Sequence, residues 1–515
     1  MYSFDFPSQV KRALSERAEV MKVLRGIEMA IILLFLSCFA FGQRPEADLT
    51  ASLLPDTTKR EVRGRIAPDS VGRFVLINRV FIVGNRLTRE QIIMRELSVK
   101  PGDLIYNLDL PQLIDLDKKK LINTRLFNTV EIRTMQLEEN KIDLLIDLNE
   151  RWYTFPSPIF ELSDRNFNEW WQNYDHDFKR VNYGLRLYQF NMRGRNETLR
   201  AIAQFGFQRR FDLMYRFPYI DKKQKHGLSV EFGFYETKNL AYQTLDHKYV
   251  FAESDEILRN ERRAGLTYSY RRSFYKTHSL NVAYRDMQVN DIVIDSNANY
   301  IHGELLQQKY PTVSYQFNSD HRDVSAYPLK GNQVLLYVAQ NGLGISDDLN
   351  NFEMSILYSK YFDLKKGFYL SNNFIGYYSN AENIPYANYG VLGQRKQFVR
   401  GYELYVVEGP RYYLNKTTFK KLIFNRNYHL ALMPARQFRY IPISVYLKTY
   451  ADLGYVKNYP YYEERNFNTR LSDKLLFGTG LGLDVVGFYD MVLRFEYSFN
   501  AEREHGFFFH VKKEF

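Results

Sequence analysis

Cysteine is nearly absent from this chain: Cys38 is the only one among 515 residues. A single cysteine excludes an intramolecular disulfide framework. Tryptophan is also scarce, with 3 residues, whereas the chain has 41 tyrosines and 39 phenylalanines. Aromatic residues are favoured in β-strands and at membrane interfaces. The composition therefore points to β-structure without disulfide support.

Long hydrophobic runs are missing as well. The one uncharged apolar run, Met29–Phe41, is shorter than the roughly 20 residues that a membrane-spanning helix needs. Basic residues precede it and small residues end it, which is typical of a secretory signal. We interpret residues 1–43 as a signal or leader segment. Cleavage after Gly42 would remove Cys38 and with it thiol catalysis, whereas acylation of Cys38, as in a lipoprotein, is the alternative.

Motifs for nucleic-acid binding and for catalysis are also lacking. The net charge of +11 is spread along the chain without a basic block, so solvated faces explain it better than a nucleic-acid groove. The 9 histidines show no HExxH spacing, and no nucleophile elbow or phosphate loop is found. We therefore expect neither an enzyme nor a cofactor, metal or nucleic-acid partner.

A short α+β domain is the first folded unit that the sequence predicts. Residues 44–73 carry no apolar period and are expected to form a flexible linker. The domain at 74–150 then begins with a strand over 74–85, followed by a helix capped by Thr88 and a second helix over 109–126. Two alternating strands close it. The expected order is β-α-α-β-β.

Alternating segments fill the chain from Trp152 onward. Sixteen of them, about ten residues each, run from Thr154 to the C-terminus. In 491–499 one face carries Met, Leu, Phe, Tyr and Phe, and the other carries Val, Arg, Glu and Ser. A soluble β-sandwich shows the same period, and it is the alternative. The export signal and the even strand number favour a transmembrane β-barrel.

The last segment adds a membrane feature. Phe507, Phe509, Val511 and the terminal Phe515 share one face of the strand. An aromatic C-terminal residue on the apolar face resembles the signal by which outer-membrane proteins are delivered for insertion.

Two groups of motifs resemble a known superfamily. The segments "VFIVGN", "IIMREL", "KPGD", "LFNTVEI" and "IDLLIDLNE" resemble a polypeptide-transport-associated (POTRA) domain. The segments "DHRDVSAYPLKG" and "VRGY" resemble the outer-membrane assembly factor BamA and its relatives, which include two-partner-secretion transporters. The resemblance covers about residues 74–515. It implies one periplasmic POTRA domain followed, over 151–515, by a barrel of about 16 antiparallel strands.

The "VRGY" motif is the main candidate site. In the family it lies at the tip of a loop that folds back into the barrel between strands eleven and twelve. Here alternation places the end of strand eleven near Ser379 and the start of strand twelve near Thr418, so we expect an inward loop over 380–417. The motif residues are Val399, Arg400, Gly401, Tyr402 and Glu403.

The lumen wall that receives this loop has a recognisable pattern. Gly478, Gly480, Gly482 and Asp484 share one face of their strand, and glycine leaves room for an approaching backbone. Asp452 faces inward on the preceding strand by the same alternation. A buried arginine needs an acidic partner. Asp452 and Asp484 are both candidates for Arg400.

The resemblance implies a function in handling polypeptides. The expected activity is assembly, insertion or translocation of unfolded outer-membrane or secreted polypeptides, in contact with outer-membrane lipids. Periplasmic or lipoprotein accessory subunits are further candidate partners. The expected location is the outer membrane of a Gram-negative cell, with the POTRA domain in the periplasm. A transporter dedicated to one secreted protein and a passive porin-like channel are the alternatives.

Overall fold

The computed structural model describes residues 74–162, 178, 181–302, 306–344, 348–380, 383–393, 397–429, 440–487, 489 and 491–513. The expected leader, the linker over 44–73 and Phe515 lie outside the described residues. Among the described helices, none has the length and apolar character needed to cross a membrane.

Residues 74–150 form a small α+β unit with a four-stranded sheet in the order β2-β1-β4-β3. β1 pairs in parallel with the central strand β4, while β3 lies at one edge. The expected order is present with one addition, the short strand β2 that follows "KPGD". The elements are β1 (Phe74–Val83), α2 (Glu90–Met94), β2 (Leu104–Tyr106), α3 (Leu110–Asn123), β3 (Phe127–Glu138) and β4 (Lys141–Glu150).

Thr88 does not cap the first helix, so this expectation was wrong. The N-cap of α2 is Arg89, which makes no side-chain cap bond. The Thr88 hydroxyl instead lies 3.1 Å from the hydroxyl of Tyr153 and accepts a hydrogen bond of 2.8 Å from Asn191. Both partners follow the small domain in sequence. The Thr88 hydroxyl therefore makes tertiary hydrogen bonds in place of the helix N-cap bond that the local motif favoured.

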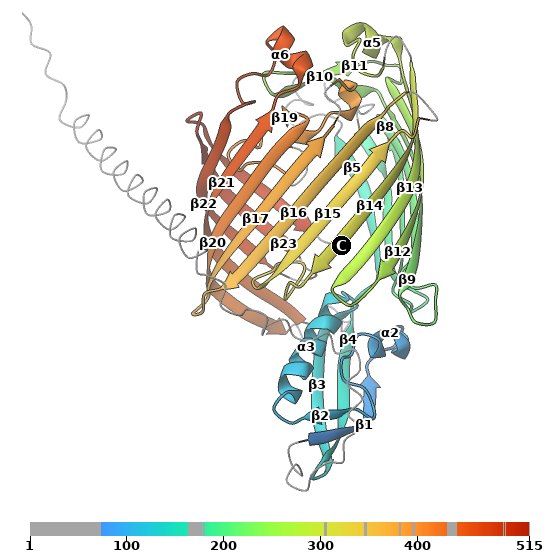
Figure 1. The fold of residues 1–515 in the computed structure, drawn as a ribbon, viewed down its shortest axis with the longest axis vertical. Coiled ribbons are helices and arrows are strands. Elements are labelled where there is room, and N and C mark those ends of the chain that lie inside the picture. Colours follow the sequence, from blue (N-terminus) through green and yellow to red (C-terminus); the bar gives the residue numbers. More distant parts are fainter. Residues whose placement is uncertain are drawn as a thin grey trace, which may run out of the picture. The chain divides into compact units, whose positions relative to one another are not determined.

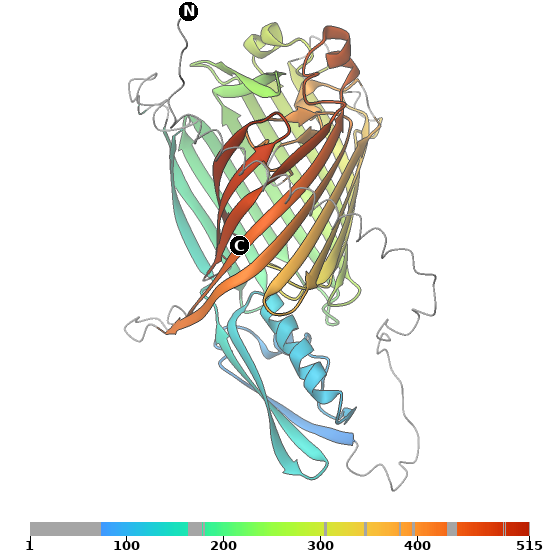
Figure 2. The same ribbon diagram turned by 90° about the vertical axis from the view of Figure 1, so that its left-hand side faces the viewer.

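After the small domain, 16 of the described strands form one antiparallel sheet, as the alternation predicted. Each strand pairs with its neighbours in chain order, and Figures 1 and 2 show the sheet curving round on itself. The strands are β5 (Thr154–Leu162), β6 (Val181–Met192), β7 (Glu197–Gly206), β8 (Gln208–Phe217), β9 (His226–Thr237), β12 (Arg259–Arg271), β13 (Lys276–Val289), β14 (Gln307–Asp320), β15 (Gly331–Asn341), β16 (Asn351–Asp363), β17 (Phe368–Ser379), β20 (Arg411–His429), β21 (Tyr440–Lys457), β22 (Leu475–Val486), β23 (Met491–Asn500) and β24 (His505–Lys513).

Alternate residues of the strands face opposite sides. Leu481, Phe507 and Phe509 are 62%, 64% and 51% exposed, whereas Asp484 is fully buried. Large apolar side chains on the exposed face and charged ones inside are the reverse of a soluble core. The side chain of Val511 lies outside the described residues.

The connections at the two ends of the sheet differ. At one end, which we call the domain end, α3 contacts the turn before β15 through a hydrogen bond of 3.0 Å from Asn123 to the carbonyl of Asp323. At the opposite end lie the hairpin of β10 (Asn239–Leu245) and β11 (Lys248–Glu253), α5 (Asp291–Ser296), η4 (Tyr386–Asn388) and α6 (Pro460–Arg465) (Figure 1). We call these elements, the hairpin turn at Asp246 and His247, and residues 466–474 between α6 and β22 the cap.

The sequence did not predict helices beyond Trp152, and α5 and α6 correct that interpretation. Each has only 6 residues, fewer than two turns, so neither repeats the apolar period that identifies a longer helix.

His247 occupies the centre of the cap and is fully buried. Its ring Nε2 accepts a hydrogen bond of 2.9 Å from the amide of Leu471, and its carbonyl accepts one of 2.9 Å from the amide of Val406. Burial, together with the charge of Arg470, lowers the pKa of His247 to about 4. The neutral ring is therefore the form that holds the cap together, because an imidazolium has no acceptor for Leu471.

Acidification is expected to weaken the cap through His247. When the cap is open, His247 has the ordinary histidine pKa of about 6.5, whereas in the closed cap its pKa is about 4. Between these two pH values only the open form takes up a proton, so acid favours the open form. Hydrogen exchange of residues 239–253, corrected for intrinsic rates, should lose protection from pH 7.5 to 5 more steeply in the wild type than in His247→Gln.

The His247→Gln variant is needed because Glu408, which contacts the cap residues Thr244 and Tyr462, changes the stability of the closed cap with pH in the opposite direction. Burial raises its pKa to about 7, so its protonation favours the closed form as the pH falls. Equal pH dependence in the wild type and His247→Gln would contradict the assignment to His247.

Candidate functional site

The segment between β17 and β20 runs from residue 380 to 410 and carries the predicted motif. Within it the short strands β18 (Val391–Leu392) and β19 (Val407–Glu408) pair with each other. The expected loop of 380–417 was too long, because β20 begins at Arg411 rather than near Thr418. Tyr412 and Leu414 face inward and are buried against the loop, so the apolar-out, polar-in alternation fails where this strand begins.

Arg400 lies inside the barrel and is only 5% exposed. Its Nε and Nη2 donate to the two oxygens of Asp452 at 2.8 and 2.6 Å, which is the bidentate geometry of a strong ion pair. Nη2 also donates to the Thr418 hydroxyl at 3.0 Å, and the guanidinium lies 3.8 Å from the centre of the Tyr450 ring. One face of this cation and its Nε and Nη2 atoms therefore have partners on the wall.

Asp484, the other candidate partner of Arg400, is connected to the arginine through Lys448 and Glu496. Its Oδ1 accepts from Lys448 at 2.6 Å and from Arg494 at 3.1 Å. Nζ of Lys448 also lies 2.7 Å from Oε1 of Glu496. The same Glu496 oxygen lies 3.4 Å from Nη1 of Arg400. Acidic and basic groups thus alternate from Asp484 to Arg400, so each buried charge is next to an opposite one.

The loop backbone approaches the wall most closely at the first glycine. A Cβ on Gly478 would lie 1.7 Å from the carbonyl oxygen of Arg400, which excludes any side chain there. A Cβ on Gly480 would instead lie 2.2 Å from the carbonyl oxygen of Tyr497 and 2.5 Å from the Tyr450 hydroxyl, and one on Gly482 would lie 2.7 Å from both the Phe495 carbonyl oxygen and Cε of Lys448. Gly478 therefore makes room for the loop, whereas Gly480 and Gly482 make room for the neighbouring strands of the wall.

The remaining motif residues form the turn that presents the arginine. Gly401 has φ +94°, a conformation that favours glycine, and its amide donates to Glu403 at 2.7 Å. Asn500 on β23 donates to the Gly401 carbonyl at 2.8 Å. Val399 and Tyr402, 2% and 3% exposed, pack into an apolar cluster formed with β17, β20, β21 and β22.

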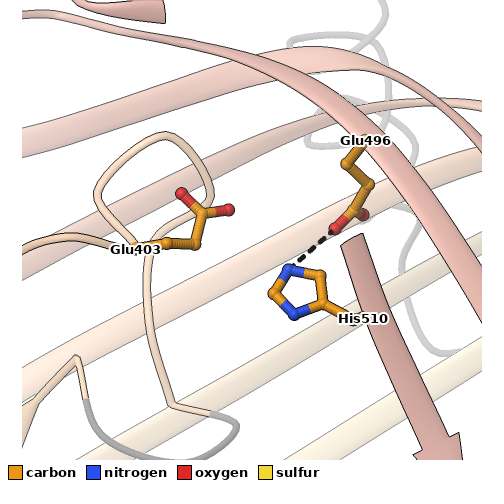
Figure 3. A group of neighbouring side chains, drawn as sticks. All are labelled: Glu403, Glu496 and His510. Carbon is orange, nitrogen blue, oxygen red and sulfur yellow. Dashed lines mark ion pairs between the residues drawn. The ribbon is translucent and has the colours of Figure 1, made fainter. Parts of the chain in front are cut away.

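Glu403, Glu496 and His510 form a group at the loop tip (Figure 3). Their ligand atoms lie within 4.8 Å of one another, and carboxylates and imidazole are groups that Zn²⁺ accepts. A cation at this position would compete with Lys448 and Arg400 for Glu496. The ring of His510, on β24, also stacks on Phe398 of the loop at 5.7 Å.

Sequence reasoning missed several members of the site: Thr418, Glu496, Tyr450 and Tyr327. Alternation placed Glu496 on the inward face of its strand, but it could not select Arg400 and Lys448 as partners, because they come from other segments. Tyr327 belongs to the "DHRDVSAYPLKG" motif, and its hydroxyl donates to Asp484 at 2.8 Å. No local signal assigns it to the lumen.

A sixteen-stranded barrel with an inward loop and a small α+β domain defines a class of outer-membrane proteins. Residues 191–515 match the model of the Omp85 superfamily domain, and residues 75–151 match the POTRA model, described as a surface antigen variable number repeat. The first match covers more than half of the chain. This chain belongs to the Omp85 superfamily.

Several solved structures are similar to this chain, and CdiB from Escherichia coli shows the same fold. The crystal structure of BamA from Haemophilus ducreyi lacking POTRA domains 1–3 is 14% identical, with a TM-score of 0.47 and 85% of each chain covered. CdiB from Escherichia coli is 11% identical with a TM-score of 0.52, covering 85% of this chain and 76% of its own. CdiB from Acinetobacter baumannii is 15% identical with a TM-score of 0.45, and the match covers 85% of this chain and 74% of the CdiB chain. A search of curated proteins found no match.

Gly478→Ala is expected to displace the loop. The added methyl group would overlap the Arg400 carbonyl. Overpacking of this kind costs about 1–3 kcal/mol, so the ratio of seated to released loop should fall about tenfold. Limited trypsin digestion of the folded protein in detergent, read by mass spectrometry at Arg400, measures this loss.

Gly487→Ala is the matched control, because a methyl group added there would have no other atom within 4 Å. Equal cleavage rates in both variants would contradict close packing of the loop on β22.

Proposed function

We propose that this protein inserts or translocates polypeptides at the outer membrane of a Gram-negative cell, with the domain at 74–150 in the periplasm. Membership of the Omp85 superfamily supports this class of function. The observation that carries the proposal is the inward loop, anchored by the buried pair of Arg400 and Asp452. A passive channel needs an open lumen and gives no role to such a loop or to the attached domain.

The small domain offers an edge for capturing a client. β3 is the outer strand of the order β2-β1-β4-β3, and its residues from Arg133 to Glu138 are exposed. A free edge pairs with an extended peptide through main-chain hydrogen bonds, which do not depend on the client's sequence. The neighbouring helix α3 is the other candidate surface.

The barrel offers a seam where a client strand could enter the lipid. β5 and β24 stand at the two ends of the strand order, and within the described residues each pairs with a single neighbour, β6 and β23 respectively. β5 contains Pro156 and Pro158, which have no amide hydrogen to donate. A nascent strand pairing here would enter the membrane with its backbone groups satisfied.

Arg400→Ala tests the role of the loop. Removing one partner of a buried ion pair costs about 3–5 kcal/mol, because Asp452 and Glu496 would lose a cation that they share. We expect the loop to leave the wall and the rate of client assembly to fall. The measurements are proteinase K cleavage within residues 397–410 of the loop, read by mass spectrometry, and the rate at which a newly made β-barrel becomes heat-modifiable on gels.

Arg426→Ala, which removes an exposed arginine from β20, the strand that follows the loop, is the control. Normal client assembly in Arg400→Ala, with the loop in its wild-type position, would count against this role.

Depletion of the protein separates the candidate functions. For a general assembly factor, an inventory of outer-membrane proteins by mass spectrometry should show loss of many barrel proteins. Loss of one secreted or surface protein would instead support the dedicated exporter, and an unchanged inventory with altered ion conductance would support the porin-like channel. The proposed class of function fails only in the last case.

A further inference from the structure

The turn between β14 and β15, residues 321–330, carries a side chain into the lumen. Tyr327 is 7% exposed and its ring packs on Tyr446 of β21, with ring centres 5.0 Å apart. Nζ of Lys420 lies 4.2 Å from the centre of the same ring. In the sheet, β16, β17, β20 and β21 separate β15 from β22, so Tyr327 reaches across the lumen rather than along the wall.

The Tyr327 hydroxyl joins the charged network that ends on Arg400. It donates to Oδ2 of Asp484 at 2.8 Å, while Oδ1 of the same carboxylate accepts from Lys448 at 2.6 Å. Nζ of Lys448 is also 2.7 Å from Oε1 of Glu496. That Glu496 oxygen receives Nη1 of Arg400 at 3.4 Å. Four consecutive contacts therefore connect the turn to the arginine of the loop.

The same turn is held by the small domain. The side chain of Asn123, the last residue of α3, donates to the Asp323 carbonyl at 3.0 Å and accepts from the Ser325 amide at 3.2 Å. Arg125 donates to the Ser325 hydroxyl at 3.1 Å. The helix end thus fixes the backbone two residues before Tyr327.

We propose that Tyr327 is a positioning residue that couples the small domain to the seating of the inward loop. Asp484 and Glu496 are almost fully buried, so a missing hydrogen bond to either is not replaced by bulk water. When α3 holds the turn, Tyr327 fixes Asp484, Asp484 orients Lys448, and Lys448 keeps Glu496 directed at Arg400. Displacement of α3 by a client would withdraw the hydroxyl and favour release of the loop. The link to clients rests on the proposed function; the coupling itself does not.

A single reporter cysteine measures loop seating directly. In a Cys38→Ser background, Val399→Cys places a thiol at a position that is 2% exposed when the loop is seated. Labelling of the full-length protein by a maleimide in detergent then proceeds at a rate set by the fraction of time that the loop is released. Protection of this thiol in the parent protein, relative to the same protein in urea, establishes the baseline.

Tyr327→Phe removes only the hydroxyl and leaves the ring packing in place. Loss of a hydrogen bond to a buried carboxylate should raise the labelling rate about tenfold. Tyr369→Phe is the control, because it removes a hydroxyl from the same aromatic cluster, where its ring packs on Tyr446. Equal rates in these two variants would overturn the proposal.

Asn123→Ala tests the connection to the small domain, with Gln112→Ala on the exposed side of α3 as its control. We expect Asn123→Ala to raise the labelling rate, and the double variant with Tyr327→Phe to be no faster than the faster single variant, because both act through one path. Fully additive effects would overturn the coupling. Faster labelling with normal client assembly would leave the coupling standing and count against the proposed function instead.

Discussion

The ion pair between Arg400 and Asp452 is the interaction on which the interior of this barrel depends. A guanidinium buried in a lumen of low dielectric is stable only with an opposite charge in direct contact, and the bidentate geometry supplies it. The surrounding features follow from that requirement. Gly478 gives the loop backbone space to bring the arginine to the wall, Tyr450 covers the face of its guanidinium, and the pair of Lys448 and Glu496 continues the alternation of charge. None of these residues would need its identity if the loop lay outside.

The loop is held by packing as well as by charge. Its apolar residues share a buried cluster with the inward faces of four strands, so the wall around β20 to β22 is apolar where a water-filled channel would be polar. On the side away from the small domain, His247 and Glu408 join segments that are far apart in sequence into one cap. Packing and cap together make the barrel interior a folded core, which suits a protein that handles polypeptides better than a passive channel.

The two places where this core is incomplete are the two places where another chain could add itself. Among the described strands, β3 pairs with β4 alone, and β5 and β24 end the strand order of the barrel. Unpaired backbone groups on strands attract further strands in water and in lipid alike. The turn that carries Tyr327 lies between the small domain and the charged network, with α3 in contact on one side and Asp484 on the other. The small domain and the inward loop are thus connected by a continuous series of contacts.

The sequence by itself determined the number of strands and which residues face inward, because alternation with period two is a local property of each strand. It also located the inward loop, since the excursion around Arg400 interrupts that period. It did not fix the start of β20, where the loop makes the inward face apolar and hides the pattern. Nor did it choose between Asp452 and Asp484, or find Glu496, Tyr327 and the role of Thr88. Those partners come from segments tens to hundreds of residues apart, and only the register and curvature of the folded sheet bring them within hydrogen-bonding distance.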